Sequence, residues 1–124
     1  MARICLVDDD ERVRDALSLG LGDAGFEVVA AEGGQEALDL LERESFSALV
    51  TDMKMPGFDG GKLITALRAR HPDLPIIAVT GGGEIAGRDV AALAQASGAN
   101  ACLVKPFRTA DIVAALERLI QARA

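Results

Sequence analysis

Three aspartates, a threonine and a lysine stand where short apolar segments of the sequence end. They are Asp8, Asp9, Asp52, Thr80 and Lys105. Carboxylates held ~4 Å apart at an effective dielectric constant near 20 repel by roughly 4 kcal/mol per pair, so a cluster of them requires a compensating cation. Oxygen ligands without histidine or cysteine favour Mg²⁺ or Mn²⁺ over zinc.

Together, these five residues match the requirements of phosphoryl transfer. A metal ion and an ammonium group neutralise phosphoryl oxygens, a hydroxyl group donates a hydrogen bond to them, and a carboxylate can itself accept the phosphoryl group. Any one of these aspartates alone could equally cap a helix or keep the surface polar. The combination of all five favours a phosphoryl-accepting site.

The elements that must position these residues are visible in the hydrophobic pattern. Strand-like apolar segments cover residues 4–7, 26–31, 48–50, 76–79 and 101–104, and helical periodicity is present at residues 13–24, 37–41, 63–67, 89–97 and 109–120. Gly25 and Gly98 are expected to end helices, Asp59 and Thr109 to cap them, and residues 53–60 and 81–83 to form loops, the second of them mobile. Five such βα units predict a parallel sheet covered on both faces, whose functional edge lies at the carboxyl ends of the strands.

Four motifs occur in a fixed order along the chain. They are Val7-Asp8-Asp9, then Asp52-Met53-Lys54-Met55-Pro56-Gly57-Phe58-Asp59-Gly60, then Thr80, then Lys105-Pro106-Phe107. With these motifs the chain resembles, over nearly its whole length, the receiver domains of two-component response regulators. The resemblance implies an α/β, flavodoxin-like fold, a doubly wound five-stranded parallel sheet with strand order 2-1-3-4-5 and five helices.

The resemblance also implies a role for each motif residue. Asp52 would be the phosphoacceptor, Asp9 a direct Mg²⁺ ligand and Asp8 a ligand acting through water. The backbone carbonyl of Lys54 would complete the protein ligands, and Mn²⁺ could replace Mg²⁺. Thr80 and Lys105 would contact the phosphoryl group, and the peptide bond from Lys105 to Pro106 would be cis. Asp10 and Glu11 have no such role and are expected to begin the first helix.

By resemblance, the expected function is that of a phosphorylation-dependent switch in a two-component phosphorelay. A histidine kinase or phosphotransfer protein would supply the phosphoryl group, and the chain would catalyse only its own phosphorylation and dephosphorylation. Residues 1–124 are expected to form one receiver domain without an output domain. The signal would therefore leave either by onward phosphotransfer or through a downstream protein, which by resemblance would bind on the face made by the fourth helix, fifth strand and fifth helix. On that face, Cys102 stands where such domains usually carry an aromatic switch residue, and the segment from Thr80 to Lys105 is a few residues longer than usual.

Composition limits the classes of partner. The formal net charge of -6, the pI near 4.7 and the absence of Trp and Tyr argue against direct nucleic-acid binding. No apolar run approaches the ~18 residues of a membrane-spanning helix, which predicts a cytoplasmic protein without membrane attachment. Cys5 and Cys102 lie in apolar segments and are expected to be buried, reduced thiols.

Three other functions compete with this interpretation. A phosphatase of the haloacid-dehalogenase type would use Asp8 and Asp10 as an Asp-x-Asp motif, although Arg12 stands where that motif requires Thr or Val and the Asp52 motif is left unexplained. A flavin-binding module needs a phosphate loop that the acidic segment after the first strand would repel. A receiver-fold scaffold that is not phosphorylated remains open.

Overall fold

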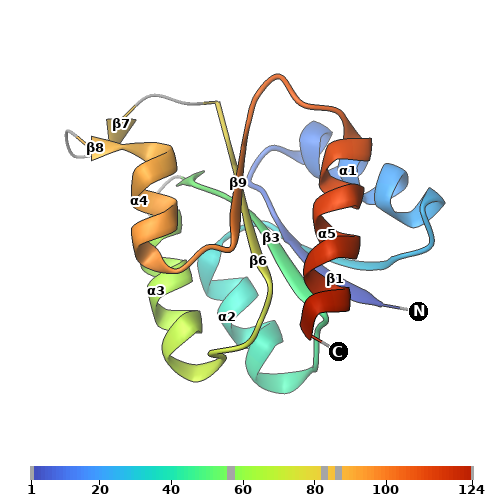
Figure 1. Cartoon of the computed structure of the whole chain (residues 1–124), viewed down its shortest axis with the longest axis horizontal. Helices are drawn as coiled ribbons and strands as arrows, with labels where there is room; N and C mark the ends of the chain where they lie inside the picture. Colours follow the sequence, from blue (N-terminus) through green and yellow to red (C-terminus); the bar gives the residue numbers. More distant parts are fainter. Residues whose placement is uncertain (1, 56–57, 82–83, 86–87, 124) are drawn as a thin grey trace.

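The computed structural model describes residues 2–55, 58–81, 84–85 and 88–123. Its main sheet has five strands, β1 (Arg3–Val7), β2 (Glu27–Ala31), β3 (Ala48–Asp52), β6 (Ile76–Thr80) and β9 (Ala101–Val104). They pair in the order β2-β1-β3-β6-β9, and every pair is parallel (Figure 1). Counted along the main sheet this order is 2-1-3-4-5, so the predicted topology is confirmed.

Helices cover both faces of this sheet, as predicted. They are α1 (Glu11–Asp23), α2 (Gly34–Arg43), α3 (Gly60–Arg70), α4 (Val90–Ser97) and α5 (Thr109–Arg123). Figure 1 shows α1 and α5 on one face, with α2, α3 and α4 on the other. Among the described residues, none of the helices is long and apolar enough to cross a membrane.

The strands are apolar on both faces because each face meets a helical layer. On β1, Ile4 and Leu6 pack with Leu17 of α1 and Leu116 of α5. Cys5 and Val7, which point the opposite way, pack in the core of α2, α3 and α4. This alternation explains why the strands read as continuous apolar runs instead of alternating apolar and polar residues.

The helix ends mostly follow the local sequence signals. Asp10 caps α1, accepting hydrogen bonds from the N–H groups of Arg12 and Val13. Gly98 ends α4 with a φ of 119°, and Gly25, just after α1, has a φ of 99°, a backbone region that glycine adopts without a Cβ clash.

The predicted cap of α5 is wrong. Thr109 is the first residue of the helix, and the side chain of Asp111 accepts a hydrogen bond of 2.8 Å from the N–H of Arg108 just before it. The Asp111 carboxylate thus satisfies a backbone donor at the helix start, which a Thr109 side chain within the first turn does not do. Asp59 directly precedes α3, and its capping role stays a prediction.

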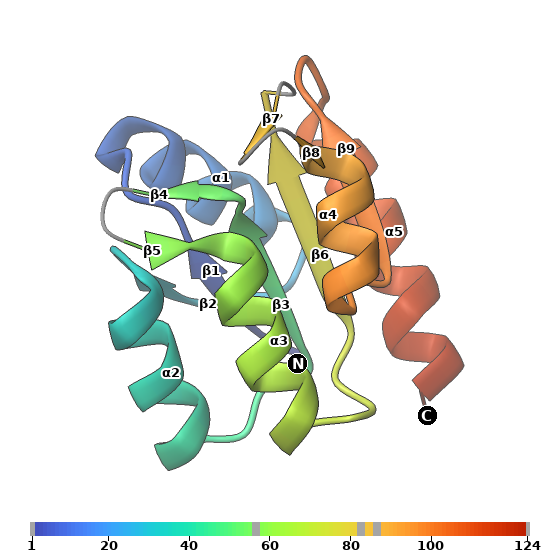
Figure 2. The ribbon, with the colours of Figure 1, turned by 90° about the vertical axis from the view of Figure 1, so that its left-hand side faces the viewer.

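The first expected loop, residues 53–60, contains a short antiparallel hairpin, and a second hairpin follows the expected loop at residues 81–83. One pairs β4 (Lys54–Met55) with β5 (Phe58–Asp59), and the other pairs β7 (Glu84–Ile85) with β8 (Arg88–Asp89). Figure 2 shows β7 and β8 beyond the carboxyl end of β6. Two-residue strands satisfy backbone groups locally but are too short to leave a hydrophobic pattern in the sequence. The predicted mobility of residues 81–83 falls largely on Gly82 and Gly83, outside the described residues.

Candidate functional site

Three carboxylates converge at the carboxyl edge of the sheet. Asp8 and Asp9 follow β1, and Asp52 is the last residue of the neighbouring strand β3. Each offers one oxygen atom, and these atoms lie within 4.8 Å of one another. Parallel pairing of Val7 with Thr51 brings the two strand ends to the same level and so assembles the cluster.

The Asp8 side chain is buried at 1% exposure. Its Oδ1 accepts a hydrogen bond of 2.9 Å from the N–H of Asp10, whereas Oδ2 has no hydrogen-bond partner within the part of the chain that the structure describes. A buried carboxylate oxygen without a partner is costly, and a hard cation would satisfy it. The donor set and the unpaired oxygen therefore fit Mg²⁺.

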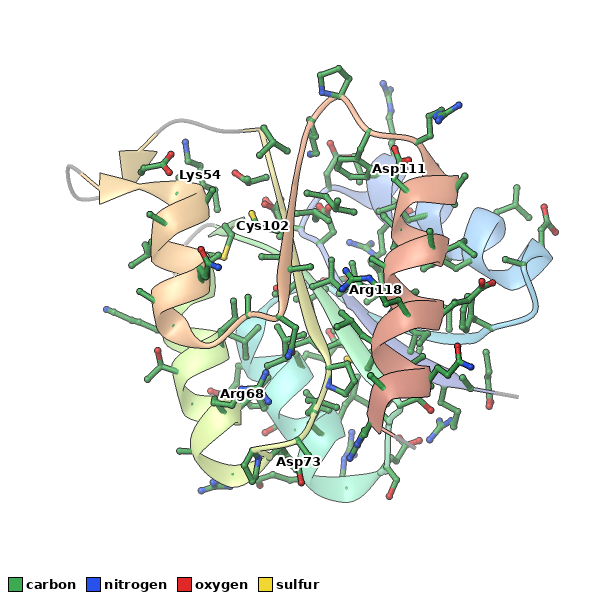
Figure 3. The ribbon with its side chains drawn as sticks, in the orientation of Figure 1. Lys54, Arg68, Asp73, Cys102, Asp111 and Arg118 are labelled. Carbon is green, nitrogen blue, oxygen red and sulfur yellow. The ribbon has the colours of Figure 1, made fainter. Side chains whose placement is uncertain are left out.

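Asp52 is half-buried at the end of the central strand β3. The N–H of Lys54 donates a hydrogen bond of 3.1 Å to its Oδ1, and the N–H of Met53 donates to the carbonyl of Val79 on β6. These contacts fix the carboxylate at the rim while leaving it partly accessible. The Lys54 side chain is exposed at the same end of the molecule (Figure 3).

Thr80 and Lys105 flank Asp52 on the side opposite to Asp8. Thr80 is the buried last residue of β6, and its carbonyl accepts a 2.7 Å hydrogen bond from the N–H of Lys105, which follows β9. The Lys105–Pro106 peptide bond is cis, as predicted. The charge of Lys105 lowers the pKa of both Asp8 and Asp52, which places this ammonium within electrostatic reach of the cluster.

The net effect on the carboxyl groups of Asp8 and Asp52 is a raised pKa. Burial is the main cause for Asp8 and Asp52, and the charge of Asp9 also raises the pKa of each. The N–H groups of Asp10 and Lys54 and the charge of Lys105 offset part of this rise. Burial and the neighbouring carboxylates thus disfavour the ionised forms of Asp8 and Asp52, and the positive charge of a bound cation would favour them.

Asp10 lies outside the cluster. Its Oδ1 accepts the N–H groups at the start of α1, 2.9 Å from the nitrogen of Arg12, and Glu11 is the first residue of that helix. The prediction that these two residues begin the first helix is confirmed. An Asp-x-Asp pair made of Asp8 and Asp10 would need both carboxylates at one reaction centre, so this geometry counts against the phosphatase.

Sequence reasoning missed Arg14. Its Nη1 donates a 2.8 Å hydrogen bond to the carbonyl of Asp8, and its backbone N–H donates to the carbonyl of Asp10. Its position in the sequence could have indicated this contact. Arg14 follows the helix cap Asp10 by four residues, so Asp10 and Arg14 lie on the same side of α1, beside the end of β1.

The two cysteines differ in their surroundings. Cys5 is buried within β1, and burial raises the pKa of its thiol to about 12. Cys102 on β9 is only half-buried, so the prediction that both thiols are buried holds for Cys5 and is wrong for Cys102. Figure 3 shows Cys102 beside α4. A strand at the edge of the sheet is less covered than β1 at its interior.

The sequence is similar to known proteins along most of its length. The family model described as response regulator receiver domain matches residues 4–117. The response regulator protein FleR of Pseudomonas aeruginosa is 42% identical over 106 residues, which are 86% of this chain and 22% of FleR. The transcriptional regulatory protein PrrA of Mycobacterium tuberculosis is 40% identical over 121 residues, 98% of this chain and 51% of PrrA.

Similarity extends to solved structures. A CheY-like response regulator receiver domain protein from Methanospirillum hungatei superposes with a TM-score of 0.91 and 27% identity, covering 99% of this chain and 96% of that one. The chain thus matches a solved receiver domain over nearly the full length of both, but spans only 22% and 51% of the two longer relatives.

Proposed function

The chain belongs to the response regulator receiver domain family, and from this membership we propose that it is a signalling switch that accepts a phosphoryl group on Asp52 in the presence of Mg²⁺. The observation that carries the proposal is the carboxylate cluster of Asp8, Asp9 and Asp52, in which the buried Oδ2 of Asp8 has no hydrogen-bond partner among the described residues. A histidine kinase or a phosphotransfer protein would supply the phosphoryl group.

Asp52 is the acceptor because of where β3 lies. This strand is central in the sheet, with Asp8 and Asp9 at the end of one neighbour and Thr80 at the end of the other. Asp52 is also more accessible than the buried Asp8. A carboxylate oxygen of Asp52 attacks phosphorus, the bond from phosphorus to the donor atom breaks, and an acyl phosphate forms.

The other residues of the site would bind the cation and neutralise the phosphoryl oxygens. Asp8, Asp9, Asp52 and the backbone carbonyl of Lys54 would hold Mg²⁺ or Mn²⁺, which supplies positive charge for the phosphoryl oxygens. Lys105 pairs with one of these oxygens, and its electrostatic effect on Asp8 and Asp52 supports this role. The Thr80 hydroxyl donates a hydrogen bond to another. The chain acts on itself and does not turn over a separate substrate.

Signal output requires a protein partner. We propose that the chain acts in the cytoplasm. The partner would bind on the face formed by α4, β9 and α5. A cavity of about 400 Å³ there is lined by Asp89, Ala91, Ala92, Gln95, Ala99, Asn100, Ala101 and Cys102. Val104 on β9 is 48% exposed, which adds an apolar contact to the same face. The net charge of -6 favours a protein partner over a nucleic acid.

Labelling with a small acyl phosphate tests the acceptor. Intact mass spectrometry should show one added phosphoryl group on the wild-type protein with Mg²⁺, and none after chelation. Asp52→Asn should remove the label, while Asp15→Asn on the exposed side of α1 should keep it. Equal labelling of wild type and Asp52→Asn would place the acceptor elsewhere.

A magnesium titration separates this function from the phosphatase and from a scaffold that binds no metal. Asp9→Ala should abolish most Mg²⁺ binding, whereas Asp10→Ala should keep it and instead lower stability by about 0.5–2 kcal/mol through loss of the helix cap. Comparable losses of Mg²⁺ affinity in the two variants would favour the Asp-x-Asp phosphatase, and no binding by wild type would favour the scaffold.

A further inference from the structure

The carbonyl oxygen of Asp8 accepts a 2.8 Å hydrogen bond from Nη1 of Arg14. We propose that Arg14 is a positioning residue of the metal site, which holds the turn between β1 and α1 so that the carboxylates of Asp8 and Asp9 face Asp52. The inference rests on the proposed function, because it concerns how the same site binds its cation.

The hydrogen bonds of Asp8 show what Arg14 contributes. The N–H of Asp8 donates to the carbonyl of Ala31 on β2 at 3.2 Å, and its Oδ1 accepts from the N–H of Asp10 at 2.9 Å. Nη1 of Arg14, which belongs to α1, donates a hydrogen bond to the carbonyl of Asp8. Three contacts from β2, the turn and the helix therefore fix Asp8, and they leave Oδ2 as the oxygen available to a cation.

The backbone of α1 at position 14 holds the other end of the turn. The backbone N–H of Arg14 donates to the carbonyl of Asp10 at 2.9 Å, the first hydrogen bond of α1. Asp9 is exposed and lies between Asp8 and Asp10 in the turn. The Arg14 side chain fixes the residue before Asp9, and the backbone of α1 fixes the residue after it, so the peptide that carries the Asp9 carboxylate is held on both sides. Only the first of these contacts depends on the arginine side chain. Outer residues that orient metal ligands typically change metal affinity by about 10–100-fold when mutated.

Charge and positioning predict opposite results. If the Arg14 guanidinium acted only as a positive charge near three carboxylates, its removal would strengthen Mg²⁺ binding, because like charges repel. If Arg14 positions Asp8 and Asp9, its removal weakens binding. The sign of the change in affinity therefore separates the two roles.

The test measures the Mg²⁺ dissociation constant of the whole chain by isothermal titration calorimetry. Arg14→Met keeps the length of the side chain and removes the donor, and it should weaken binding about tenfold. Arg14→Lys retains a donor and should restore part of the affinity. Arg12→Met removes the same charge from an exposed position in the same helical turn and should leave affinity unchanged or slightly higher.

Labelling with acyl phosphate supplies a second readout. In Arg14→Met the Mg²⁺ concentration for half-maximal labelling should rise about as much as the dissociation constant, whereas the maximal rate at saturating Mg²⁺ should stay near the wild-type value. Circular dichroism monitors folding, and all measurements are made well below the melting temperature of each variant.

The outcomes distinguish this inference from the function on which it rests. A wild-type protein that binds no Mg²⁺ overturns the proposed function. A wild-type protein that binds Mg²⁺ while folded Arg14→Met binds equally or more tightly overturns the positioning role alone. A lower melting temperature with unchanged Mg²⁺ affinity also overturns it, because Arg14 would then only stabilise the fold.

Discussion

Asp8 and Asp10 are separated by one residue, yet their carboxylates perform different tasks. Asp8 is buried, and its Oδ2 has no hydrogen-bond partner among the described residues, while Asp10 is exposed and caps α1. The difference comes from their hydrogen bonds and burial and not from their chemical type. The same reasoning at single residues leads to two predictions.

The first concerns the lifetime of the phosphorylated state. Lys54 stands two residues after the acceptor, its N–H contacts Asp52, and its side chain is exposed. An ammonium group has no lone pair with which to orient an attacking water, whereas an amide oxygen can accept a hydrogen bond from it. Lys54→Asn should therefore lose its phosphoryl group several-fold faster than wild type, measured by mass spectrometry after removal of the donor.

The control for this measurement is Lys62→Asn, which removes an exposed lysine of α3. It should decay at the wild-type rate. A phosphorylated Lys54→Asn protein that is as long-lived as wild type would show that the side chain at this position does not limit hydrolysis.

The second concerns pH. Burial raises the pKa of Asp8 and of Asp52 above the ordinary value of 3.8, so the metal-free native state binds protons more tightly than the unfolded chain. Stability falls with rising pH wherever the native state binds more protons. The contribution of these two groups is therefore full below 3.8 and is lost as pH rises through their raised pKa values.

Thermal unfolding in a chelator, followed by circular dichroism between pH 4 and 7.5, checks this sign. The melting temperature of Asp52→Asn minus that of wild type should increase with pH, because the variant lacks one of the two groups. Added Mg²⁺ at 100 times its dissociation constant should then stabilise wild type by about 2.7 kcal/mol and Asp52→Asn by less. A difference in melting temperature that shrinks as pH rises would contradict the raised pKa of Asp52.

At the scale of elements, Arg68 joins four segments at the end of the molecule away from the site. Figure 3 shows its side chain pointing from α3 toward the sheet. Nε and Nη2 donate to the carbonyl of Gly98, at 3.1 and 2.7 Å, and Nη2 also reaches Oδ1 of Asn100 at 2.9 Å. Nη1 donates to the carbonyls of His71, Pro72 and Leu74. One side chain therefore fastens the ends of α3 and α4 to the loops before β6 and β9.

Arg68→Met should lower the free energy of unfolding by about 2–4 kcal/mol, because several partly buried carbonyls lose a charged donor. Arg70→Met is the matched control, since Arg70 forms an exposed ion pair with Glu42 and such pairs contribute about 0–1 kcal/mol. Urea unfolding followed by circular dichroism measures both. A loss below about 1 kcal/mol for Arg68→Met would mean that water replaces the arginine at these carbonyls.

For the whole molecule, the two ends of α4 are anchored differently. Its carboxyl end is held by Arg68 through Gly98, whereas its amino end follows the β7–β8 hairpin beyond Thr80. A change at Thr80 should therefore alter the hairpin and the start of α4 more than the end of the helix. The half-buried Cys102 has no aromatic ring and therefore cannot act as an aromatic switch residue.

Hydrogen exchange tests this route of signalling. Binding of a beryllofluoride phosphoryl mimic with Mg²⁺ should raise protection across residues 81–97, because the Thr80 hydroxyl moves to the bound mimic and draws the hairpin over the site. Thr80→Ala should abolish the rise while keeping Mg²⁺ affinity, and Cys102→Ala should leave it nearly unchanged. Full protection before the mimic is added, or loss of the response in Cys102→Ala, would rule out ordering of this segment as the switch.

Much of this architecture follows from the order of residues alone. Buried parallel strands require continuous apolar segments, and their carboxyl ends meet at one edge, so the five strands and the convergence of Asp8, Asp9 and Asp52 could be predicted. Gly98 was readable as a helix end because the left-handed backbone there disfavours residues with a Cβ.

Other features depend on distances that no local pattern contains. The short β4–β5 and β7–β8 hairpins have too few residues to show periodicity, and the Asp111 contact at the start of α5 depends on the path of the preceding turn. The sequence places Asp8, Asp10 and Arg14 near a strand end. Only the packing of β1 against α1 and β2 determines that Asp10 caps the helix, that Arg14 binds the Asp8 carbonyl, and that Oδ2 of Asp8 has no partner among the described residues. Each outcome is set by the relative placement of three separate segments.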